Sequence, residues 1–472
     1  MTVRADVAVV GGGITGLVAA HRLSEAGANV ILLERSARLG GLVTTDHEDG
    51  YVIEGGADSF VSGKRSVLEL ARKLGLGGEV ISSRPEHRGS YVWWDGNLLP
   101  LPGGLHLMVP TRIRSLLGSP LLSWWGRARA MADLVLPRSG AAHDESLESF
   151  VTRRFGRQML DRIAEPLIAG IHAAEPATMS LRASFPRLLD MESEHRSLIL
   201  AARRAATRPT PAGGLSHFAT FAGGMSQLVG GLVGASAGVA IRTGVGARTM
   251  EVAARGFRVG LDDGSVVVAD CVVLATPARA ASELLADIVP AAAGALSGIH
   301  QVASTSVTLA FEARSLPPLA GSGFVVPSVQ GRMISGVSYL SQKWDNRVPN
   351  PEFVLLRAFI DRNRGRGLAQ ADDESLTRVV MQELNVMIGI EATPVRTWMR
   401  AFEEALHQYT MGHLGRVAAA ERALKAKHGL VLAGAAFHGI GLNECIDSGN
   451  QAAEAVIDPL AVRPPVTAGE PH

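Results

Sequence analysis

Three glycines near the start of the chain have the spacing of a loop that binds a dinucleotide. Gly11, Gly13 and Gly16 lie in the segment GGGITG and satisfy the pattern GxGxxG. In such a loop the first glycine permits a tight turn, the second lets the backbone approach a pyrophosphate, and the third lets a helix pack on a strand. Glu34, farther along the chain, is an acid that can accept a hydrogen bond from a ribose hydroxyl. Because the glycines alone would also fit an ordinary glycine-rich turn, the flanking segments decide between the two interpretations.

Those flanking segments predict the unit that positions the loop. Residues 3–10 (VRADVAVV) are typical of a buried parallel strand, and residues 29–34 (NVILLE) of a second one. Between them Leu17, Ala20 and Leu23 recur at helical spacing. Strand, glycine loop, helix and a second strand ending in an acid make a βαβ unit. The sequence therefore predicts an α/β fold with a Rossmann-like dinucleotide-binding domain.

The residues that follow favour a flavin over a nicotinamide. The segment ERSARLGGLVTT at 34–45 is similar to the RxGG signature of the amine oxidase and protoporphyrinogen oxidase class of flavoproteins. The segment EGGADSF at 54–60 resembles that class's ExGPxSF turn, which lies against the flavin ring. The resemblance implies FAD as the cofactor. In this part of the chain it assigns cofactor binding to Gly11, Gly12, Gly13, Ile14, Thr15, Gly16, Glu34, Arg35, Arg38, Gly40, Gly41, Leu42, Gly56, Ala57, Asp58 and Ser59.

Two later regions are expected to return to the cofactor. Residues 429–456 begin with a buried strand and a glycine-rich turn, and a helix is predicted to start near Asn443. A helix N-terminus carries free backbone N–H groups and a partial positive charge, which would stabilise a reduced flavin. By resemblance Ile440, Gly441 and Leu442 bind the flavin there, and Ala247 aligns with a valine whose backbone meets the adenine.

Four internal segments make the resemblance specific to the protoporphyrinogen/coproporphyrinogen oxidase family. In the family's order they are RGSYVWWDGNLLPLP at 88–102, AGIHAAEPATMSLRASFP at 169–186, ESEHRSLIL at 192–200 and QYTMGHLGRV at 408–417. Membership implies FAD-dependent oxidation of a porphyrinogen, either protoporphyrinogen IX or coproporphyrinogen III, to the porphyrin of haem biosynthesis. Dioxygen is then the expected electron acceptor, with hydrogen peroxide as product, and a ferrochelatase-type enzyme is the expected partner.

The implied reaction requires a binding site for the substrate but no catalytic side chains. Hydride leaves a methylene bridge for the flavin, so no general base and no metal is assigned, while the propionates need cations. The resemblance places Arg88 against a propionate and Gly170 and Val325 against the macrocycle. Arg88 could equally be a surface arginine, and Val325 could equally belong to a buried strand.

The pattern along the chain indicates three regions. A discontinuous FAD-binding domain is expected from 1–98, 211–280 and 418–460, a mainly helical domain from 99–210, and a β-rich substrate-binding domain from 281–417. In the helical region Trp124 and Trp125 stand beside arginines, a composition typical of a surface that contacts a membrane. The alternative is a solvated basic subdomain with two core tryptophans.

Composition excludes several other classes. The chain has 46 Lys and Arg against 45 Asp and Glu, so no overall positive field would gather nucleic acid. Cys271 and Cys445 are its only cysteines, which excludes a disulfide framework and fits a reducing cytosol. No signal peptide is recognisable, and no apolar run reaches the roughly 18 residues that a spanning helix needs. We therefore expect a cytoplasmic protein, with peripheral contact at the inner face of the cell membrane.

The chain departs from the family pattern at a few positions. Ala57 replaces the proline of ExGPxSF, Phe402 replaces a tryptophan, and His407 replaces a proline, while an aromatic-Ala-Gly-acid run reads His172 to Glu175. These departures leave two alternatives open. One is another flavin enzyme such as an amine oxidase or a carotenoid desaturase, and the other is a weakly catalytic protein that binds FAD or a tetrapyrrole.

Overall fold

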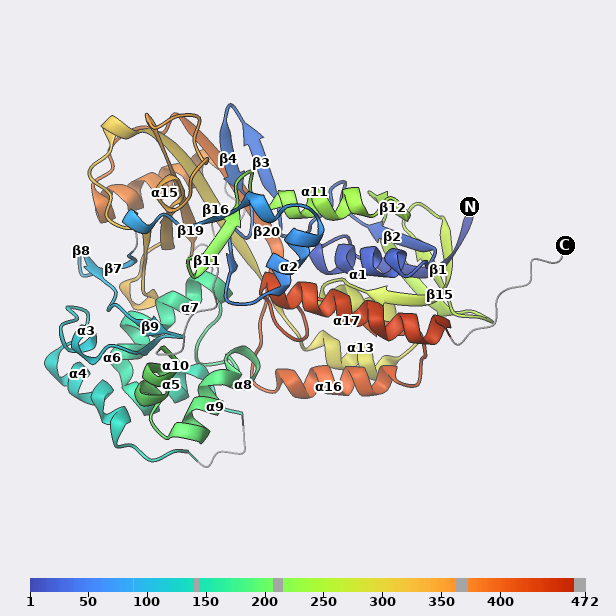
Figure 1. Ribbon diagram of the computed structural model, residues 1–472, viewed down its shortest axis with the longest axis horizontal. Helices are drawn as coiled ribbons and strands as arrows, with labels where there is room; N and C mark the ends of the chain where they lie inside the picture. The colour runs from blue at the N-terminus through green and yellow to red at the C-terminus, as the bar shows by residue number, and fades with distance from the viewer. Residues whose placement is uncertain (88, 140–143, 207–214, 362–371, 462–472) are drawn as a thin grey trace.

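The chain forms three packed regions in an elongated molecule (Figure 1). The computed structural model describes residues 1–87, 89–139, 144–206, 215–361 and 372–461. One end holds a mainly parallel sheet with helices on both faces, and the other end holds a second sheet above a group of short helices. The α/β fold predicted from the sequence is confirmed.

The first sheet has the βαβ unit at its centre. Its strands run in the order β12 (Val239–Thr243), β2 (Val30–Glu34), β1 (Thr2–Val10), β15 (Val266–Leu274), β14 (Phe257–Leu261) and β13 (Ala247–Val252), with β21 (Leu430–Leu432) paired to the far end of β15. β12, β2, β1, β15 and β21 pair in parallel, and β14 and β13 pair antiparallel. The carboxyl ends of the parallel strands therefore meet at one edge, where ligands bind in such sheets.

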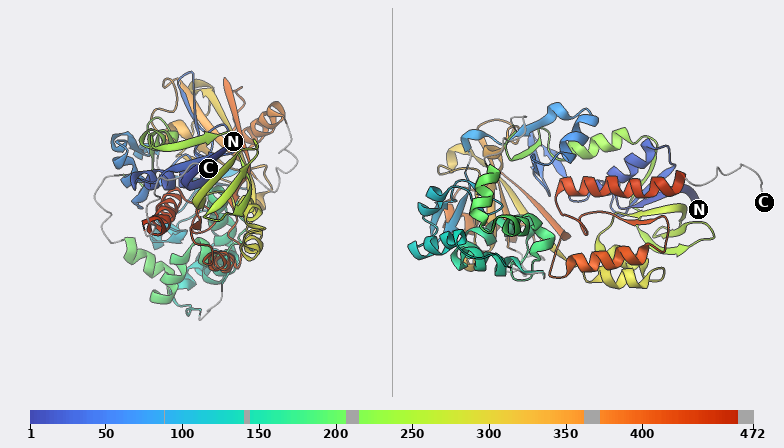
Figure 2. Two further views of the ribbon diagram at one scale, coloured as in Figure 1. Left: turned by 90° about the vertical axis from the view of Figure 1, so that its right-hand side faces the viewer. Right: turned by 60° about the horizontal axis from the view of Figure 1, so that its bottom comes forward.

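Alternate residues of the central strands face opposite layers of helices. Val7 and Val9 pack under α1 (Ile14–Glu25), α2 (Ser66–Lys73), α11 (Ser226–Ala235) and α17 (Leu442–Ala461). Ala8 and Val10 pack on α12 (Ala278–Leu285), α13 (Pro290–Ser297) and α16 (His413–Leu424). Figure 2 shows α17, in red, and α16, in orange, on the two sides of this sheet. Residues 278–297, most of which were expected in the substrate-binding region, thus lie in the core of the first sheet.

The second sheet is built almost wholly from the second half of the chain. Its order is β20 (Arg396–His407), β16 (Gln301–Glu312), β19 (Phe353–Ile360), β18 (Ile334–Tyr339), β17 (Gly323–Val325), β7 (Tyr91–Trp94) and β8 (Asn97–Pro100). α14 (Leu340–Lys343) follows β18, and the core on one face of the sheet is closed by α15 (Asp373–Ile388). β7 and β8 come from the first hundred residues and extend the sheet by pairing with β17.

Short elements connect the two sheets. β3 (Thr45–Glu48) and β4 (Tyr51–Glu54) form a hairpin, and β5 (Phe60–Val61), β11 (Phe218–Phe221) and β6 (Val80–Ser82) form a three-stranded sheet. The buried guanidinium of Arg347 donates to the Phe221 and Ala222 carbonyls at 3.0 and 2.9 Å, which fastens β11 to the region of the second sheet. β11 therefore lies where the three regions meet (Figure 1).

The segment from 105 to 206 is mainly helical, as predicted. It contains the hairpin β9 (Leu105–His106) and β10 (Val109–Pro110), then α3 (Ile113–Leu117), α4 (Trp124–Met131), α5 (Leu147–Phe155), α6 (Arg157–Met159), α7 (Glu165–His172), α8 (Leu181–Ser184), α9 (Pro186–His195) and α10 (Leu198–Ala206). These helices share one apolar core around Phe150, Phe155 and Ile163. Trp124 and Trp125 are not part of that core, since they are 62% and 67% exposed and stack on each other at 3.7 Å. The interpretation as two core tryptophans is therefore wrong.

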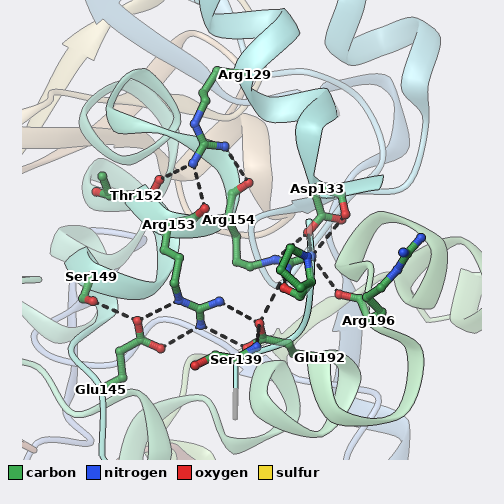
Figure 3. A network of polar contacts seen from close by, with 11 residues as sticks. Arg129, Asp133, Ser139, Glu145, Ser149, Thr152, Arg153, Arg154, Glu192 and Arg196 are labelled. Carbon is green, nitrogen blue, oxygen red and sulfur yellow. Dashed lines mark hydrogen bonds and ion pairs between the residues drawn. The ribbon is translucent and has the colours of Figure 1, made fainter. Parts of the chain in front are cut away.

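A buried network of charges holds these helices together (Figure 3). The Arg154 guanidinium is fully buried and donates to the Asp133 carboxylate and to the Pro137 and Arg196 carbonyls. Arg153 pairs with Glu145 at 2.8 Å and with Glu192 at 2.7 Å. Residues from 133–145 and from 192–196 thus converge on two adjacent arginines of α5.

None of the helices in the described ranges is both long and apolar enough to cross a bilayer. Cys271 and Cys445 are both buried, and they form no disulfide with each other.

Candidate functional site

The glycine loop connects β1 to α1 at the carboxyl edge of the first sheet. A Cβ at Gly16 would lie less than 3.0 Å from the Gly11 carbonyl oxygen, so only glycine allows this close packing of helix on strand. A Cβ at Gly13 would meet nothing within 4 Å, so this position faces open space. No side chain caps the N-terminus of α1, and its first turn has no acid. Free N–H groups beside open space suit a phosphate.

Glu34 ends β2 beside this loop. One of its carboxylate oxygens accepts from the Gly12 N–H at 2.7 Å, and the other accepts from the Ser36 N–H at 2.7 Å. The Val245 N–H donates to the Glu34 carbonyl at 2.9 Å, which brings the start of β13 and Ala247 alongside. Arg35 lies in the same place, because a Cβ at Gly246 would meet its side chain at 3.3 Å. The residues predicted to bind ribose and adenine therefore lie together.

The RxGG segment links the glycine loop to the turn at residues 56–59. The Gly40 N–H donates to the Gly12 carbonyl at 2.8 Å, and the Arg38 guanidinium donates to the Gly41 carbonyl at 2.9 Å. A Cβ at Gly56 would lie less than 3.0 Å from the Leu42 carbonyl oxygen. The two motifs are thus in direct backbone contact although the sequence separates them.

The predicted C-terminal motif closes the same edge of the sheet. α17 starts at Leu442, and the Cys445 N–H donates to the Gly441 carbonyl at 2.9 Å in its first turn. α17 packs against α1, and a Cβ at Gly434, in the loop between β21 and α17, would lie 3.9 Å from the Thr15 hydroxyl at the start of α1. Glu444 pairs with Lys64, so the first turn of α17 is tied to the segment that follows β5.

Sequence reasoning missed a set of buried charges beneath the turn at 56–59. Arg357, 3% exposed on β19, donates to the Gly55 and Gly56 carbonyls at 2.6 and 2.8 Å. Lys343 pairs with Asp58 at 3.3 Å. Burial opposes ionisation of Asp58, but the Lys343 ammonium and the Ser59 hydroxyl outweigh it and lower the pKa of Asp58. The second sheet thereby fixes the turn that resembles a flavin-contacting motif.

A second buried acid supports this turn from behind. Glu54 is fully buried, and it accepts from the Met225 N–H at 2.9 Å and from the Thr45 hydroxyl at 2.7 Å. Burial raises the pKa of the Glu54 carboxyl to about 7, although Thr45 and the Arg347 guanidinium, 3.8 Å away, favour the charged form. The sequence offered one signal for these buried charges, which is that Arg357 interrupts the apolar strand FVLLRAFI.

Two histidines lie near the loop before α17. His413 stacks on Tyr409 at 3.9 Å, and the Tyr409 hydroxyl donates to the Ala435 carbonyl at 2.8 Å and accepts from the Gly439 N–H at 2.7 Å. His407, which departs from the family's proline, is 8% exposed, and neither of its ring nitrogens has a partner among the described residues. Burial lowers the pKa of His407 to about 4, assisted by His413. His407 is therefore neutral in the folded protein near pH 7.

The structure describes two of the three residues that were predicted to bind the substrate. Arg88 lies outside the described residues. Gly170 lies in α7, where a Cβ would meet nothing within 4 Å, and Val325 ends β17, against which α7 packs. Val325 is partly buried, and its side chain packs on the core of the helical region. Phe402 lies 5.9 Å beneath the Arg38 guanidinium, so this departure is close to the RxGG segment.

Comparison with known proteins agrees with the geometry. The chain matches the family of flavin containing amine oxidoreductases over residues 14–457. It is 34% identical to the coproporphyrinogen III oxidase of Propionibacterium freudenreichii, covering 95% of this chain and 90% of that protein. It is 31% identical to human protoporphyrinogen oxidase, covering 96% and 98% of the two chains. A structure from Exiguobacterium sp. 255-15, provisionally described as a protoporphyrinogen oxidase, superposes with a TM-score of 0.85 at 29% identity and covers 97% of this chain and 99% of that one.

These observations together settle the cofactor. The uncapped N-terminus of α1, the open space at Gly13 and the carboxylate of Glu34 fit a dinucleotide, and the family match identifies the redox group as a flavin. The prediction of FAD is confirmed. The chain belongs to the flavin containing amine oxidoreductase family.

Proposed function

We propose that this chain oxidises a porphyrinogen to a porphyrin with FAD in haem biosynthesis. The observation that carries the proposal is the end-to-end similarity to a coproporphyrinogen III oxidase, at 34% identity over 95% of the chain. The structure of a putrescine oxidase also covers 97% of this chain, but at 17% identity and a TM-score of 0.68 it shows a shared fold alone. The relatives include oxidases named for coproporphyrinogen III and for protoporphyrinogen, so their names leave the choice between the two substrates open.

Bound FAD supplies the acceptor for the hydride that leaves a methylene bridge of the substrate. The chain's own residues bind FAD and the substrate, orient them and polarise the reacting groups. We assign the pyrophosphate to the loop at 11–16, the adenosine to Glu34, Arg35 and Ala247, and the flavin ring to the turn at 56–59 and to residues 440–442. Arg357 and Lys343 hold the 55–59 turn in place from the second sheet. Dioxygen is the proposed electron acceptor, with hydrogen peroxide as product.

For the substrate we retain Arg88 as the residue that pairs with a propionate, and Gly170 and Val325 as contacts to the macrocycle. The open space at Gly170 and the partial burial of Val325 support an apolar ligand that lies beside α7 and β17. A metal-inserting enzyme of the ferrochelatase type would be the consumer of the product.

We further propose a peripheral membrane contact at α4 in the helical region. Trp124 and Trp125 present a stacked, exposed aromatic surface, which suits the interface of a bilayer. The neighbouring arginines are less available to lipid headgroups than the sequence suggests, because their guanidinium groups donate to backbone carbonyls. Arg127 donates to the Ser119 carbonyl at 2.7 Å, and Arg129 donates to the Arg153 carbonyl at 2.7 Å.

Aerobic turnover of the purified, FAD-loaded protein tests the proposal. Coproporphyrinogen III and protoporphyrinogen IX would be supplied separately, with porphyrin fluorescence and peroxide followed together against an enzyme-free control, because both substrates autoxidise. Acceleration of either substrate supports the proposal. Oxidation of amines alone would show a different flavin enzyme, and bound FAD with no turnover of any substrate would show a binding protein.

A further inference from the structure

Two stacked rings contact the loop that leads from β21 to α17. The ring of Tyr409, just after β20, stacks on the ring of His413, the first residue of α16, with centres 3.9 Å apart and planes at 15°. Tyr409 is 6% exposed, and His413 is fully buried. Each ring also carries a polar atom that binds the backbone of the loop.

Three alternate residues of this loop are bound in that way. The Tyr409 hydroxyl donates to the Ala435 carbonyl at 2.8 Å and accepts from the Gly439 N–H at 2.7 Å. The His413 Nε2 lies 3.1 Å from the Phe437 carbonyl, which only accepts, so Nε2 carries the proton of this bond. Burial lowers the pKa of His413 to about 4, so the ring is neutral near pH 7. Backbone without regular structure thus has its polar groups satisfied by two side chains.

The segment that carries Tyr409 is anchored outside the loop. The Tyr409 carbonyl accepts from the Ser180 N–H of the helical region at 2.8 Å. The neighbouring Gln408 N–H donates to the His300 carbonyl, next to β16 of the second sheet, at 2.8 Å. The helical region and both sheets therefore meet at Tyr409, and the position of the loop depends on all three.

The part of the loop that Tyr409 holds ends directly before the residues to which we assign the flavin ring. Gly439 has a φ of 137°, and a Cβ there would lie less than 3.0 Å from the side chain of Glu444 in the first turn of α17. The loop is therefore closely packed on the start of the helix. A shift of the backbone at Gly439 would move residues 440–442 and the N–H groups at the N-terminus of α17.

Another side-chain contact to this loop is exposed to solvent. His438 pairs with Glu421 of α16 at 2.7 Å, and the two side chains are 52% and 46% exposed. Such exposed pairs contribute little to stability. The buried rings of Tyr409 and His413 therefore hold residues 435–439 more firmly than this pair does.

We propose that Tyr409 and His413 are positioning residues that hold residues 440–442 against the flavin ring and thereby raise its reduction potential. This inference rests on the proposed assignment of the flavin ring to residues 440–442. Backbone N–H groups and the positive end of α17, held in fixed positions, stabilise the negative charge of a reduced flavin. Release of the loop would weaken that stabilisation. The residues assigned to the pyrophosphate and the adenosine lie on other segments and would keep FAD bound.

Tyr409→Phe tests the proposal, because it keeps the stacked ring and removes only the hydroxyl. Tyr339→Phe is the matched control, since Tyr339 is 1% exposed on β18 and its hydroxyl has no partner among the described residues. His413→Phe is a second variant, which keeps a ring and removes the bond to the Phe437 carbonyl. For each FAD-loaded protein, flavin content would be measured, and the reduction potential would be determined by anaerobic reduction in equilibrium with a reference dye.

We expect the ratio of reduced to oxidised flavin at a fixed dye potential to fall about tenfold in Tyr409→Phe, which is about 30 mV for a two-electron couple. The ratio should fall in the same direction in His413→Phe, and Tyr339→Phe should match the wild type. An unchanged potential in Tyr409→Phe, or an equal fall in Tyr339→Phe, would overturn the inference. If Tyr409→Phe did not retain FAD, the same criteria would apply to His413→Phe.

The dye titration needs no porphyrinogen, so it separates this inference from the proposed function. A lowered potential in Tyr409→Phe, in a protein whose wild type oxidises neither porphyrinogen, would support the positioning role while the proposed function fails. Porphyrinogen oxidation by the wild type with an unchanged potential in Tyr409→Phe would support the function and overturn the positioning role.

Discussion

The buried ion pair of the helical region allows a quantitative test of how that region is held together. Asp133 and Arg154 are both fully buried, and the Arg154 guanidinium donates to the Asp133 carboxylate with Nε at 2.8 Å (Figure 3). The other Asp133 oxygen accepts from the Ser197 hydroxyl at 2.7 Å and from the Ile199 N–H at 3.0 Å. One carboxylate thus joins α5 to the start of α10.

Replacing Asp133 by alanine would leave a buried guanidinium without its main counter-charge. Breaking a buried pair in this way costs about 3–5 kcal/mol of unfolding free energy. Arg154 keeps the Pro137 and Arg196 carbonyls at 3.0 and 2.7 Å, so we expect the lower end of that range, about 3 kcal/mol. Removing both charges in Asp133→Leu/Arg154→Met should cost at least about 2 kcal/mol less than the sum of the two single changes.

Urea unfolding of the FAD-loaded protein measures these differences. Far-UV circular dichroism would report the loss of the helices, and flavin absorbance would report the first sheet. Arg157→Ala is the control, since Arg157 is 60% exposed in its ion pairs and should change stability by less than about 1 kcal/mol. If Asp133→Ala unfolded at the same urea concentration as this control, or if the two single changes were additive, the reasoning would be refuted.

Three further perturbations test other parts of the structure. Gly16→Ala should abolish FAD binding, because the new Cβ would lie less than 3.0 Å from a backbone carbonyl oxygen, and flavin content after purification would show it. The pKa of His407 falls from 6.5 to about 4 on folding. Neutral His407 therefore contributes up to about 3 kcal/mol to the free energy of unfolding above pH 6.5, and this contribution is lost as the pH falls toward 4. His407→Leu should therefore flatten the fall in stability between pH 7.5 and pH 5, and an unchanged pH profile would contradict this. Trp124→Ser/Trp125→Ser should reduce co-sedimentation with anionic lipid vesicles while leaving flavin content unchanged; equal sedimentation would rule out this surface as the membrane contact.

Local patterns were sufficient to predict the nucleotide-binding unit. Gly11, Gly16 and Glu34 lie where the βαβ pattern predicted them, because strand, turn and helix are close in sequence and each has a clear local signal. The start of α17 near Asn443 was predicted for the same reason. The helical character of the 105–206 segment likewise follows from its periodicity.

Interactions between distant segments could not be predicted in this way. Arg357 contacts the Gly55 carbonyl across 302 positions of sequence, and Lys343 reaches Asp58 across 285. Only pairing of β19 beside β16 and packing of the 55–59 turn on the second sheet bring these groups together. The exposure of Trp124 was also undetermined, since the same residues suit a core or a surface until the neighbouring helices are placed.

An anaerobic titration tests the proposed function most directly. Porphyrinogen would be added to the FAD-loaded protein without oxygen while the visible absorbance of the oxidised flavin and the appearance of porphyrin are followed together. We predict that the flavin is bleached at about three flavins for each porphyrinogen consumed, with porphyrin formed in step and the absorbance restored when air is admitted. A flavin that stays oxidised in the presence of both porphyrinogens, although fully bound, would contradict the proposal that this chain is a porphyrinogen oxidase.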